Sequence, residues 1–211
     1  MNNLAQLPID SFLDRLASDA PTPGGGGVAA LCGALATSLG NMVASFTTGR
    51  ERYAQYQSTI DQITAELTYL QGLLTHAIDE DAQAFTAVME AYALPKSTDI
   101  EKQTRTEAIQ TALKSATQVP YQVMVNCRKG LATCELAIGK CNTHVITDLG
   151  AAAILFEAAA QASLLNVLVN TNMLHDTCYA DEYRDQAHAL LTHCQNISQT
   201  IQTHVLHQIS T

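Results

Sequence analysis

The chain has 211 residues, which is the size of a single domain with one core. Because 47% of the residues are hydrophobic and only 15% are charged, the composition excludes a disordered chain. The net charge of -9 at pH 7 excludes the basic stripe of a nucleic-acid-binding protein, but a local cluster of Lys and Arg would suffice to bind a small anion.

Almost the whole chain shows the three- and four-residue spacing of apolar side chains that is typical of helices. The pattern predicts helices over about residues 9–18, 26–48, 58–93, 100–138, 142–174 and 181–209, with a break or kink at Pro120. The sequence shows no strand-like alternation, no internal repeat and no sustained heptad pattern. It therefore predicts an all-α fold, a single-domain bundle of long, partly antiparallel helices over residues 1–211.

The segment Val28–Phe46 carries no charge and is long enough to be considered as a membrane span. Small and polar residues, among them Gly33, Ser38 and Asn41, make it only weakly apolar, and no belt of Trp and Tyr flanks it. We therefore expect a soluble helix that is buried on most sides, and no association with a membrane.

The six cysteines form no C-x-x-C pair, so their spacing supports neither a zinc site nor a redox motif. Cys127, Cys134 and Cys141 are seven residues apart and would share one side of a helix. His204 and His207 lack a third ligand at metal spacing, so no metal is predicted. The amino terminus lacks the basic and apolar segments of a secretion signal. We expect a cytoplasmic protein with reduced, buried thiols.

One position in the apolar stripe of the third predicted helix holds a carboxylate, Asp81. Burial opposes ionisation and raises the pKa of a carboxyl, and an unpaired buried charge costs several kcal/mol. Asp81 is therefore either a functional acid or base, or part of an ion pair or cap-like hydrogen bond inside the bundle. The apolar residues of the stripe are Ile60, Ile63, Leu67, Leu70, Leu74, Ile78, Phe85, Val88 and Met89.

Polar residues also interrupt the fifth predicted helix at Asp148, Asn166 and Asn170. The two asparagines share a face, and Asp148 points the same way. At about 1.5 Å per residue, Asp148 and Asn166 are roughly 27 Å apart and cannot contact the same reacting atom. A long ligand, two separate sites or a second subunit would account for both, and hydrogen bonds between helices are the structural alternative for the asparagines.

The run Gly24–Gly27 precedes the uncharged helix. Such a run exposes backbone N–H groups at the positive end of the helix dipole, where carboxylates or phosphates bind. The missing strand and the missing Gly-Lys-Ser/Thr exclude the dinucleotide-binding and P-loop motifs, and close packing without a ligand is the alternative. Cations available to an anionic ligand are Arg50, Arg52, Lys96, Lys102 and Arg105.

Four stretches occur in order along the chain: "SDAPTPGGGGVAALCGALATSLGNMVA", "DEDAQAF", "ALPKST" and "TDLGAAAILFEAAAQASLLNVLVN". Together they resemble the formiminotransferase-cyclodeaminase carboxy-terminal family, which includes stand-alone methenyltetrahydrofolate cyclohydrolases, over nearly the whole chain. The resemblance implies an all-helical domain that forms a homodimer and acts on a tetrahydrofolate derivative, with no cofactor beyond this substrate.

The resemblance also assigns residues. The second Asp of the family's D-x-D-A-x-A-F motif, here Asp81, is the expected catalytic acid or base. Asp148, in an S-D motif in which Thr147 replaces Ser, is the second expected catalytic residue, and it or the asparagines would position the pterin or an attacking water. Gly27 stands where the family has Ser, which removes a hydroxyl that would cap the helix or touch the ligand. The expected substrate-binding residues are Asp79, Pro23, Gly24, Gly25, Gly26, Gly27, Asn142, Asn166, Asn170, Lys96 and Arg50.

The implied enzyme is a 5-formiminotetrahydrofolate cyclodeaminase, a C–N lyase, or a 5,10-methenyltetrahydrofolate cyclohydrolase, an amidine hydrolase. Both reactions move a proton to or from a nitrogen beside a cationic carbon, and one partly desolvated Asp can serve both. The sequence does not separate them. A folate-binding or interaction protein without turnover is the alternative that Gly27 leaves open, and the presence of Asp81 and Asp148 argues against it.

Overall fold

The computed structural model describes residues 3–210. Its short 3-10 helices are η1 (Leu4–Gln6), η2 (Glu51–Tyr56) and η3 (Thr143–Val145), and its α-helices are α1 (Ile9–Leu16), α2 (Gly25–Ser45), α3 (Gln57–Ala93), α4 (Asp99–Glu135), α5 (Ile146–Thr171) and α6 (Thr177–Ser210). Residues 3–210 contain no strand. The predicted all-α fold is confirmed, and the predicted helices end within a few residues of the observed ones.

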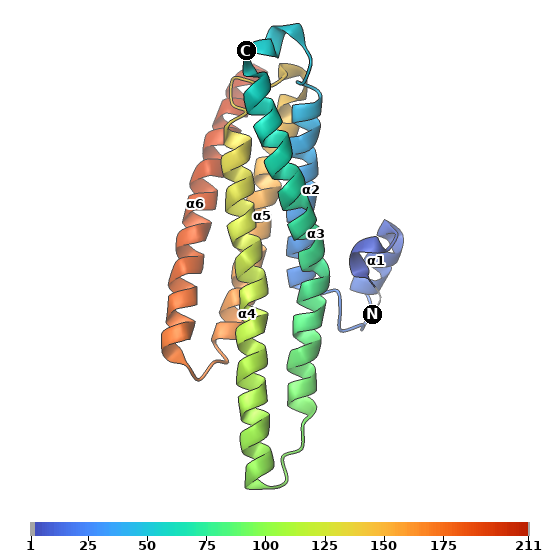
Figure 1. The fold of residues 1–211 in the computed structure, drawn as a ribbon, viewed down its shortest axis with the longest axis vertical. Helices are drawn as coiled ribbons and strands as arrows, with labels where there is room; N and C mark the ends of the chain where they lie inside the picture. The colour runs from blue at the N-terminus through green and yellow to red at the C-terminus, as the bar shows by residue number, and fades with distance from the viewer. Residues whose placement is uncertain (1–2, 211) are drawn as a thin grey trace.

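Helices α2 to α6 run alternately up and down and form the bundle (Figure 1). Helix α2 packs on α3 and α5, α4 packs on α3, α5 and α6, and α5 also packs on α6. Helices α3 and α4 extend beyond the start of α2 as a two-helix hairpin, and α1 lies to the side of α3 (Figure 1). The start of α2 is therefore halfway along the molecule and not at its end.

Helix α4 begins at a capping box and continues through a proline. The Thr98 hydroxyl accepts the N–H of Glu101, whose carboxylate accepts the N–H of Thr98. Pro120 has no N–H for the carbonyl of Ala116, and the Nδ2 group of Asn170 on α5 donates to that carbonyl at 2.8 Å instead. Of the predicted break or kink at Pro120, the break is wrong, because the helix runs on through the proline.

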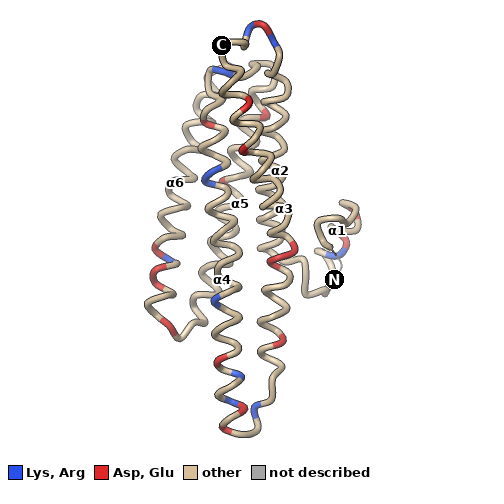
Figure 2. Tube along the Cα trace, in the orientation of Figure 1, with Lys and Arg blue, Asp and Glu red and all other residues tan. Residues whose placement is uncertain are grey.

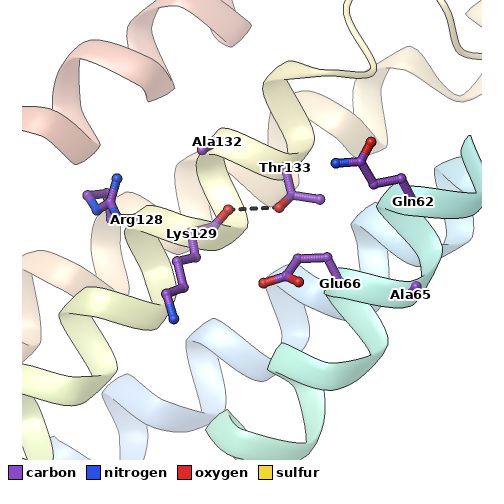
Figure 3. Close-up of a pocket in the computed structure, with 7 residues that line it drawn as sticks. All are labelled: Gln62, Ala65, Glu66, Arg128, Lys129, Ala132 and Thr133. Carbon is purple, nitrogen blue, oxygen red and sulfur yellow. Dashed lines mark hydrogen bonds between the residues drawn. The ribbon is translucent and has the colours of Figure 1, made fainter. Parts of the chain in front are cut away.

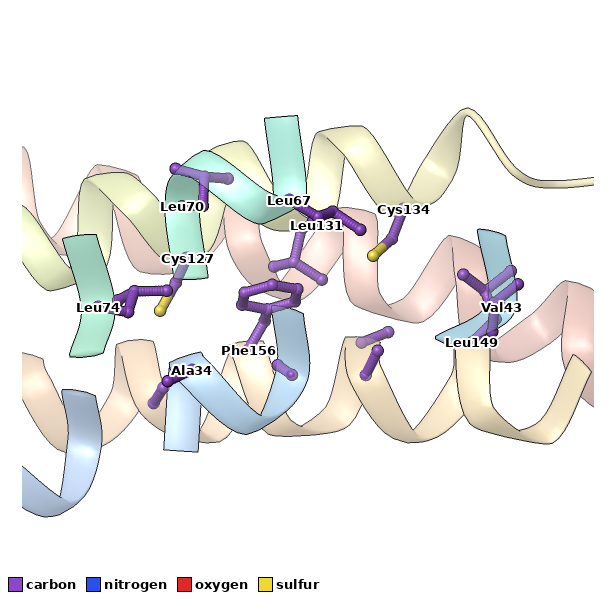
Figure 4. Close-up of a cluster of buried hydrophobic side chains, with 14 of the residues drawn as sticks. Ala34, Val43, Leu67, Leu70, Leu74, Cys127, Leu131, Cys134, Leu149 and Phe156 are labelled. Atoms are coloured by element: carbon purple, nitrogen blue, oxygen red, sulfur yellow. The ribbon is translucent and has the colours of Figure 1, made fainter. Parts of the chain in front are cut away.

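The core is a seam of aliphatic and small residues between α2, α3, α4 and α5 (Figure 4). Leu67, Leu74, Leu131 and Phe156 are fully buried in it. Gly130 admits the Phe156 ring, since a Cβ on this glycine would lie 2.9 Å from Cε2 of the ring. Small residues thus let the helices approach closely without tryptophan in the core.

Two residues of the predicted apolar stripe on α3 do not face the core. Phe85 is 41% exposed and Met89 is 52% exposed, whereas Ile78 and Val88 are buried. Helix α2 begins only at Gly25, next to Asp81, so among the described residues α2 does not extend along this side of α3 toward the hairpin. The expected apolar stripe is therefore buried at Ile78 and Val88, and the prediction is wrong at Phe85 and Met89.

Two stretches, Gly25–Ser45 and Thr143–Thr171, are long and apolar enough to cross a membrane by length and composition alone. They pack against each other inside the bundle, as expected for core helices. Figure 2 shows charged residues on the hairpin, on α6 and at the end of the bundle, with none on α2. Only 56% and 44% of the two apolar stretches are buried, so part of their surface is an exposed apolar face.

Candidate active site

Asp81 lies where the first turn of α2 meets α3. Its Oδ2 atom accepts a hydrogen bond of 2.9 Å from the backbone N–H of Gly27. A Cβ atom on Gly26 would stand 2.6 Å from Cγ of Asp81, so the carboxyl fills the space that a side chain at position 26 would need. None of the four ion pairs within residues 3–210 involves Asp81. Of the two structural alternatives, the cap-like hydrogen bond is present and the ion pair is not.

The surroundings of Asp81 change its affinity for a proton. Burial raises the pKa of the Asp81 carboxyl above its ordinary value, and the hydrogen bond from Gly27 lowers the pKa by a smaller amount. The partial positive charge at the start of α2 also favours the ionised form. A carboxyl with a raised pKa and no cationic partner can both accept and donate a proton, which is the property of a general acid–base group.

The glycine turn and Asn166 border Asp81 on the side of α5. A Cβ atom on Gly25 would lie 3.8 Å from Nδ2 of Asn166, whose amide donates to the carbonyl of Ala162 in its own helix. The first N–H groups of a helix have no acceptor within the helix, so those of Gly25 and Gly26 are left for an acceptor outside it. The structure thus brings together Asp81, Asn166, Pro23, Gly24, Gly25, Gly26 and Gly27.

Asp79 belongs to the same sequence motif as Asp81 but contacts a different segment of the chain. Its Oδ1 atom accepts the N–H of Leu4 at 2.7 Å, which ties η1 to α3. Beside it, a cleft of about 520 Å³ separates η1 and α1 from α3. The cleft is also lined by Thr22, whose carbonyl accepts the Nε–H of Arg15 at 2.8 Å. The cleft reaches the chain just before the glycine turn, and Asp81 is not among its lining residues.

Asn142 and Asn170 are engaged inside the fold. The Asn142 side chain is buried, donates to the carbonyl of Phe46 at 3.0 Å and accepts the N–H of His144 at 3.1 Å. The Asn170 amide donates to the carbonyl of Ala116. Both side chains therefore form hydrogen bonds that join segments of the bundle, which for Asn170 is the structural alternative.

Three other expected site residues lie far from Asp81 within one chain. Asp148 is in the first turn of α5, an uninterrupted helix, so its distance of roughly 27 Å from Asn166 holds. Arg50 is exposed in the turn after α2, at the same end of the bundle as Asp148. Lys96 is exposed between α3 and α4, about 22 Å along α3 from Asp81. No small ligand contacts all of them in a single chain.

Comparison with known proteins gives the family. Residues 8–189 match the family described as formiminotransferase-cyclodeaminase. The chain belongs to this family. It is 40% identical over 193 residues to the methenyltetrahydrofolate cyclohydrolase of Methylorubrum extorquens, and the match covers 92% of this chain and 93% of that protein.

Two further relatives differ in the share of their own length that this family member covers. The formimidoyltransferase-cyclodeaminase of Gallus gallus is 30% identical over 188 residues, which are 89% of this chain but only 35% of that protein. The crystal structure of formiminotetrahydrofolate cyclodeaminase from Thermotoga maritima matches with a TM-score of 0.88 at 26% identity, over 97% of this chain and 98% of that one. The family and fold inferred from the sequence are confirmed.

A groove elsewhere on this family member is separate from the glycine turn. It lies between α3 and α4, has a volume of about 460 Å³ and is lined in part by Glu66, Lys129 and Thr133 (Figure 3). Glu66 and Lys129 both extend toward it, so it offers charges of both signs. Glu66 precedes Asp81 by about four turns of α3, which is roughly 22 Å. Within residues 3–210, no group of three or more His, Cys, Asp or Glu is arranged to hold a metal ion.

Sequence reasoning did not single out Arg15 and Leu4. Both are hydrogen-bonded next to the site, Arg15 to the carbonyl of Thr22 and Leu4 to the carboxylate of Asp79. Each bond joins a side chain to a backbone group, and the second spans 75 positions of sequence. No motif or periodicity marks such contacts, so only the folded chain reveals them.

Proposed function

We propose that this protein is a stand-alone 5,10-methenyltetrahydrofolate cyclohydrolase in which Asp81 carries the proton. One observation carries the proposal: a half-buried carboxyl without an ion-pair partner in residues 3–210, held at the start of α2 by a single N–H. The choice of reaction is supported by the similarity to the Methylorubrum extorquens cyclohydrolase, whose length this chain nearly matches.

In this reaction, water attacks the carbon that bridges N5 and N10 of the methenyl cation. The Asp81 carboxylate accepts a proton from the water, the bond from this carbon to N5 breaks, and Asp81 donates its proton to N5. The products are 10-formyltetrahydrofolate and one proton, which comes from the hydroxyl of the adduct as it becomes the formyl oxygen. The positive charge of the substrate favours ionised Asp81 before the attack, and neutralisation of that charge favours the protonated acid afterwards.

Cyclodeamination of 5-formiminotetrahydrofolate is the second candidate. The full-length similarity to the Thermotoga maritima cyclodeaminase favours it. In this reaction, N10 attacks the carbon of the protonated formimino group, and ammonia leaves to give the methenyl cation. Asp81 would transfer the proton from N10 to the departing nitrogen, so one carboxyl at one position serves either reaction.

The near-ultraviolet absorption of the methenyl cation distinguishes these functions. Loss of the band from added 5,10-methenyltetrahydrofolate identifies a cyclohydrolase, and a gain of the band from 5-formiminotetrahydrofolate identifies a cyclodeaminase. Asp81→Asn should abolish either change, because it keeps the shape and removes the exchangeable proton, whereas Glu80→Gln on the exposed face should retain it. Binding without any change in the band would support the folate-binding alternative, and a full rate in Asp81→Asn would remove Asp81 from the mechanism.

The proposal includes a homodimer through the exposed apolar face of α2 and α5. Leu35 is 51% exposed, Ile154 is 50% exposed and Leu165 is 68% exposed, and these two helices have almost no charge. An apolar face of this kind is typical of an interface between subunits. If the two copies cross this face antiparallel, the Asp148 end of one copy meets the Asp81 end of the other. A second subunit then accounts for the separation of the two acids.

Mixing inactive variants tests the shared site. Asp81→Asn and Asp148→Asn chains should each be inactive as pure dimers. After subunit exchange, half of the dimers are mixed and each has one intact site, so about a quarter of the wild-type rate should return. A mixture that stays inactive would show that the two acids do not combine across an interface. Leu165→Glu should reduce the particle mass in solution to the 22.6 kDa of one chain.

The proposal also concerns the glutamate tail of the folate substrate. The carboxylates of this tail would bind the free N–H groups of Gly25 and Gly26, or Lys96 on the hairpin, or Arg50 of the second copy.

The proposal places the protein in the cytoplasm. The six cysteines of the sequence are all free, which suits the reducing cytoplasm. No cofactor beyond the tetrahydrofolate substrate is required, because the cation itself supplies the electrophile.

A further inference from the structure

Glycines spaced by seven residues along α2 meet α3 and α4 in successive layers of the core. A Cβ atom on Gly33 would lie 3.1 Å from Leu74 and 3.4 Å from Sγ of Cys127. One heptad later, a Cβ atom on Gly40 would lie 2.6 Å from Leu67 and 3.2 Å from Sγ of Cys134. Each layer therefore consists of one glycine, one leucine and one cysteine, and Figure 4 shows the leucines and cysteines of both layers.

The layer before Gly33 has the same spacing and a different chemistry. Gly26 precedes Gly33 by seven residues, and Asp81 follows Leu74 by seven, so Asp81 occupies the position of the leucine. A Cβ atom on Gly26 would meet Cγ of Asp81 at 2.6 Å, as the one on Gly40 would meet Leu67. By sequence spacing, Pro120, seven residues before Cys127, corresponds to the cysteine of the other two layers. The Asp81 carboxyl thus occupies the position that a leucine side chain occupies in the other two layers.

Contacts with Gly26 and Gly27 also hold the Asp81 carboxyl in place. Its Oδ2 atom accepts the N–H of Gly27, and the rest of the group lies against the backbone of Gly26. Position 27 is different, because a Cβ atom there would lie 3.7 Å from Oδ2 of Asp81, an ordinary contact. A side chain at position 27 therefore fits beside the carboxyl, whereas one at position 26 competes for its space.

We infer that Gly26 is a positioning residue for the proton carrier: the missing side chain at position 26 leaves the space in which the Asp81 carboxyl is held on the N–H of Gly27. The inference rests on the proposed function for its catalytic consequence. Carbon atoms in contact lie at about 3.5–4.0 Å, so a Cβ at position 26 would displace the carboxyl by about 1 Å. The role differs from binding of the substrate, which is what the sequence suggested for this glycine.

Gly26→Ala tests the inference, with Gly33→Ala as the matched control on the same face of α2. A displacement of about 1 Å can cost a reaction about 100-fold, and we expect a loss of that size in kcat for Gly26→Ala. Gly33→Ala adds a methyl group against Leu74 and Cys127, so it should lower the melting temperature and keep the rate per folded molecule. Equal rates in the two variants would overturn the inference.

A measurement without turnover separates the inference from the proposed function. The amide proton of Gly27 is bonded to the Asp81 carboxylate, so its NMR shift should change with pH as this carboxyl titrates. The pH-dependent change should persist in Gly33→Ala and disappear in Gly26→Ala, as it does in Asp81→Asn. Should the wild type show no turnover, the proposed function fails, and the Gly27 amide still decides the inference. A Gly26→Ala chain that keeps the titration overturns it.

A double variant decides the case in which Gly26→Ala does not fold. Asp81→Ala removes the carboxyl, so the added methyl group at position 26 finds room and Gly26→Ala should fold in that background. Circular dichroism and the melting temperature report the result. Unfolding of the double variant to the same extent as Gly26→Ala alone would show that the two positions do not share one space, and the inference would fail.

Discussion

Replacing Asp81 by asparagine is expected to make the folded protein more stable at neutral pH. Below the ordinary pKa of an aspartate, the carboxyl is protonated in both the folded and the unfolded chain. As the pH rises, the unfolded chain loses this proton first, because burial raises the pKa of Asp81 in the folded chain. The wild-type protein therefore loses stability between the ordinary and the raised pKa, and the loss stays constant above the raised pKa.

The loss amounts to about 1.4 kcal/mol for each unit by which folding raises the pKa. Asparagine keeps an acceptor for the N–H of Gly27 and carries no charge, so the variant avoids the loss. With a urea m-value of about 2 kcal/mol per molar, each unit corresponds to an increase of about 0.7 M in the unfolding midpoint. The acid proposed for catalysis thus costs stability, as is common for groups held in active sites.

Urea unfolding followed by circular dichroism at a series of pH values checks this prediction. The difference between Asp81→Asn and the wild type should be absent in acid, grow as the pH rises and then become constant. Glu90→Gln removes the same charge from an exposed position of the same helix that takes part in none of the four ion pairs within residues 3–210, and its difference from the wild type should show no such growth. A variant less stable than the wild type at neutral pH, or a difference independent of pH, would refute the reasoning.

Two further predictions concern the bundle. Asn170→Ala should lower the free energy of unfolding by about 1–3 kcal/mol, because the Ala116 carbonyl loses a donor that Pro120 cannot replace. Pro120→Ala in the same chain should recover much of that loss in urea unfolding, and no recovery would show that the two residues are independent. A thiol reagent should modify Cys178 quickly in the native protein, because this thiol is exposed. A buried thiol should react slowly, since burial raises the pKa of Cys134, for example, to about 12. Fast modification of several thiols would contradict the buried positions.

The helices and the central acid could be predicted because both depend on local spacing. A 3.6-residue period identifies a helix and its buried face, and Asp81 was recognised as a carboxylate within that face. The glycine run was recognised as the entry of a helix for the same local reason. The contact between Gly26 and Asp81 joins positions 55 residues apart, and its geometry became visible only in the folded chain.

Features that depend on a partner helix could not be predicted. Phe85 has the correct spacing for the core, but it is exposed because α2 starts too late to cover it. Asn170 has the spacing of a ligand-binding residue, but its amide is bonded to a carbonyl on α4. The layers could not be predicted because the glycines, leucines and cysteines lie on three different helices. The seven-residue spacing of Cys127, Cys134 and Cys141 is visible in the sequence, but the spacing does not show which residues of other helices meet them.

The equal spacing of the layers has a consequence for how α2 and α3 find their alignment during folding. Sliding α2 by one heptad would bring Gly26 to Leu74 and Gly33 to Leu67, so the apolar contacts would be nearly as good as before. Polar contacts between the two helices distinguish the correct alignment: the N–H of Gly27 donates to Asp81 at the start of α2, and further along Gln71 donates to the Ser38 hydroxyl and Asn41 donates to the Thr68 hydroxyl. The acid proposed for catalysis therefore also selects one alignment among near-equivalent ones.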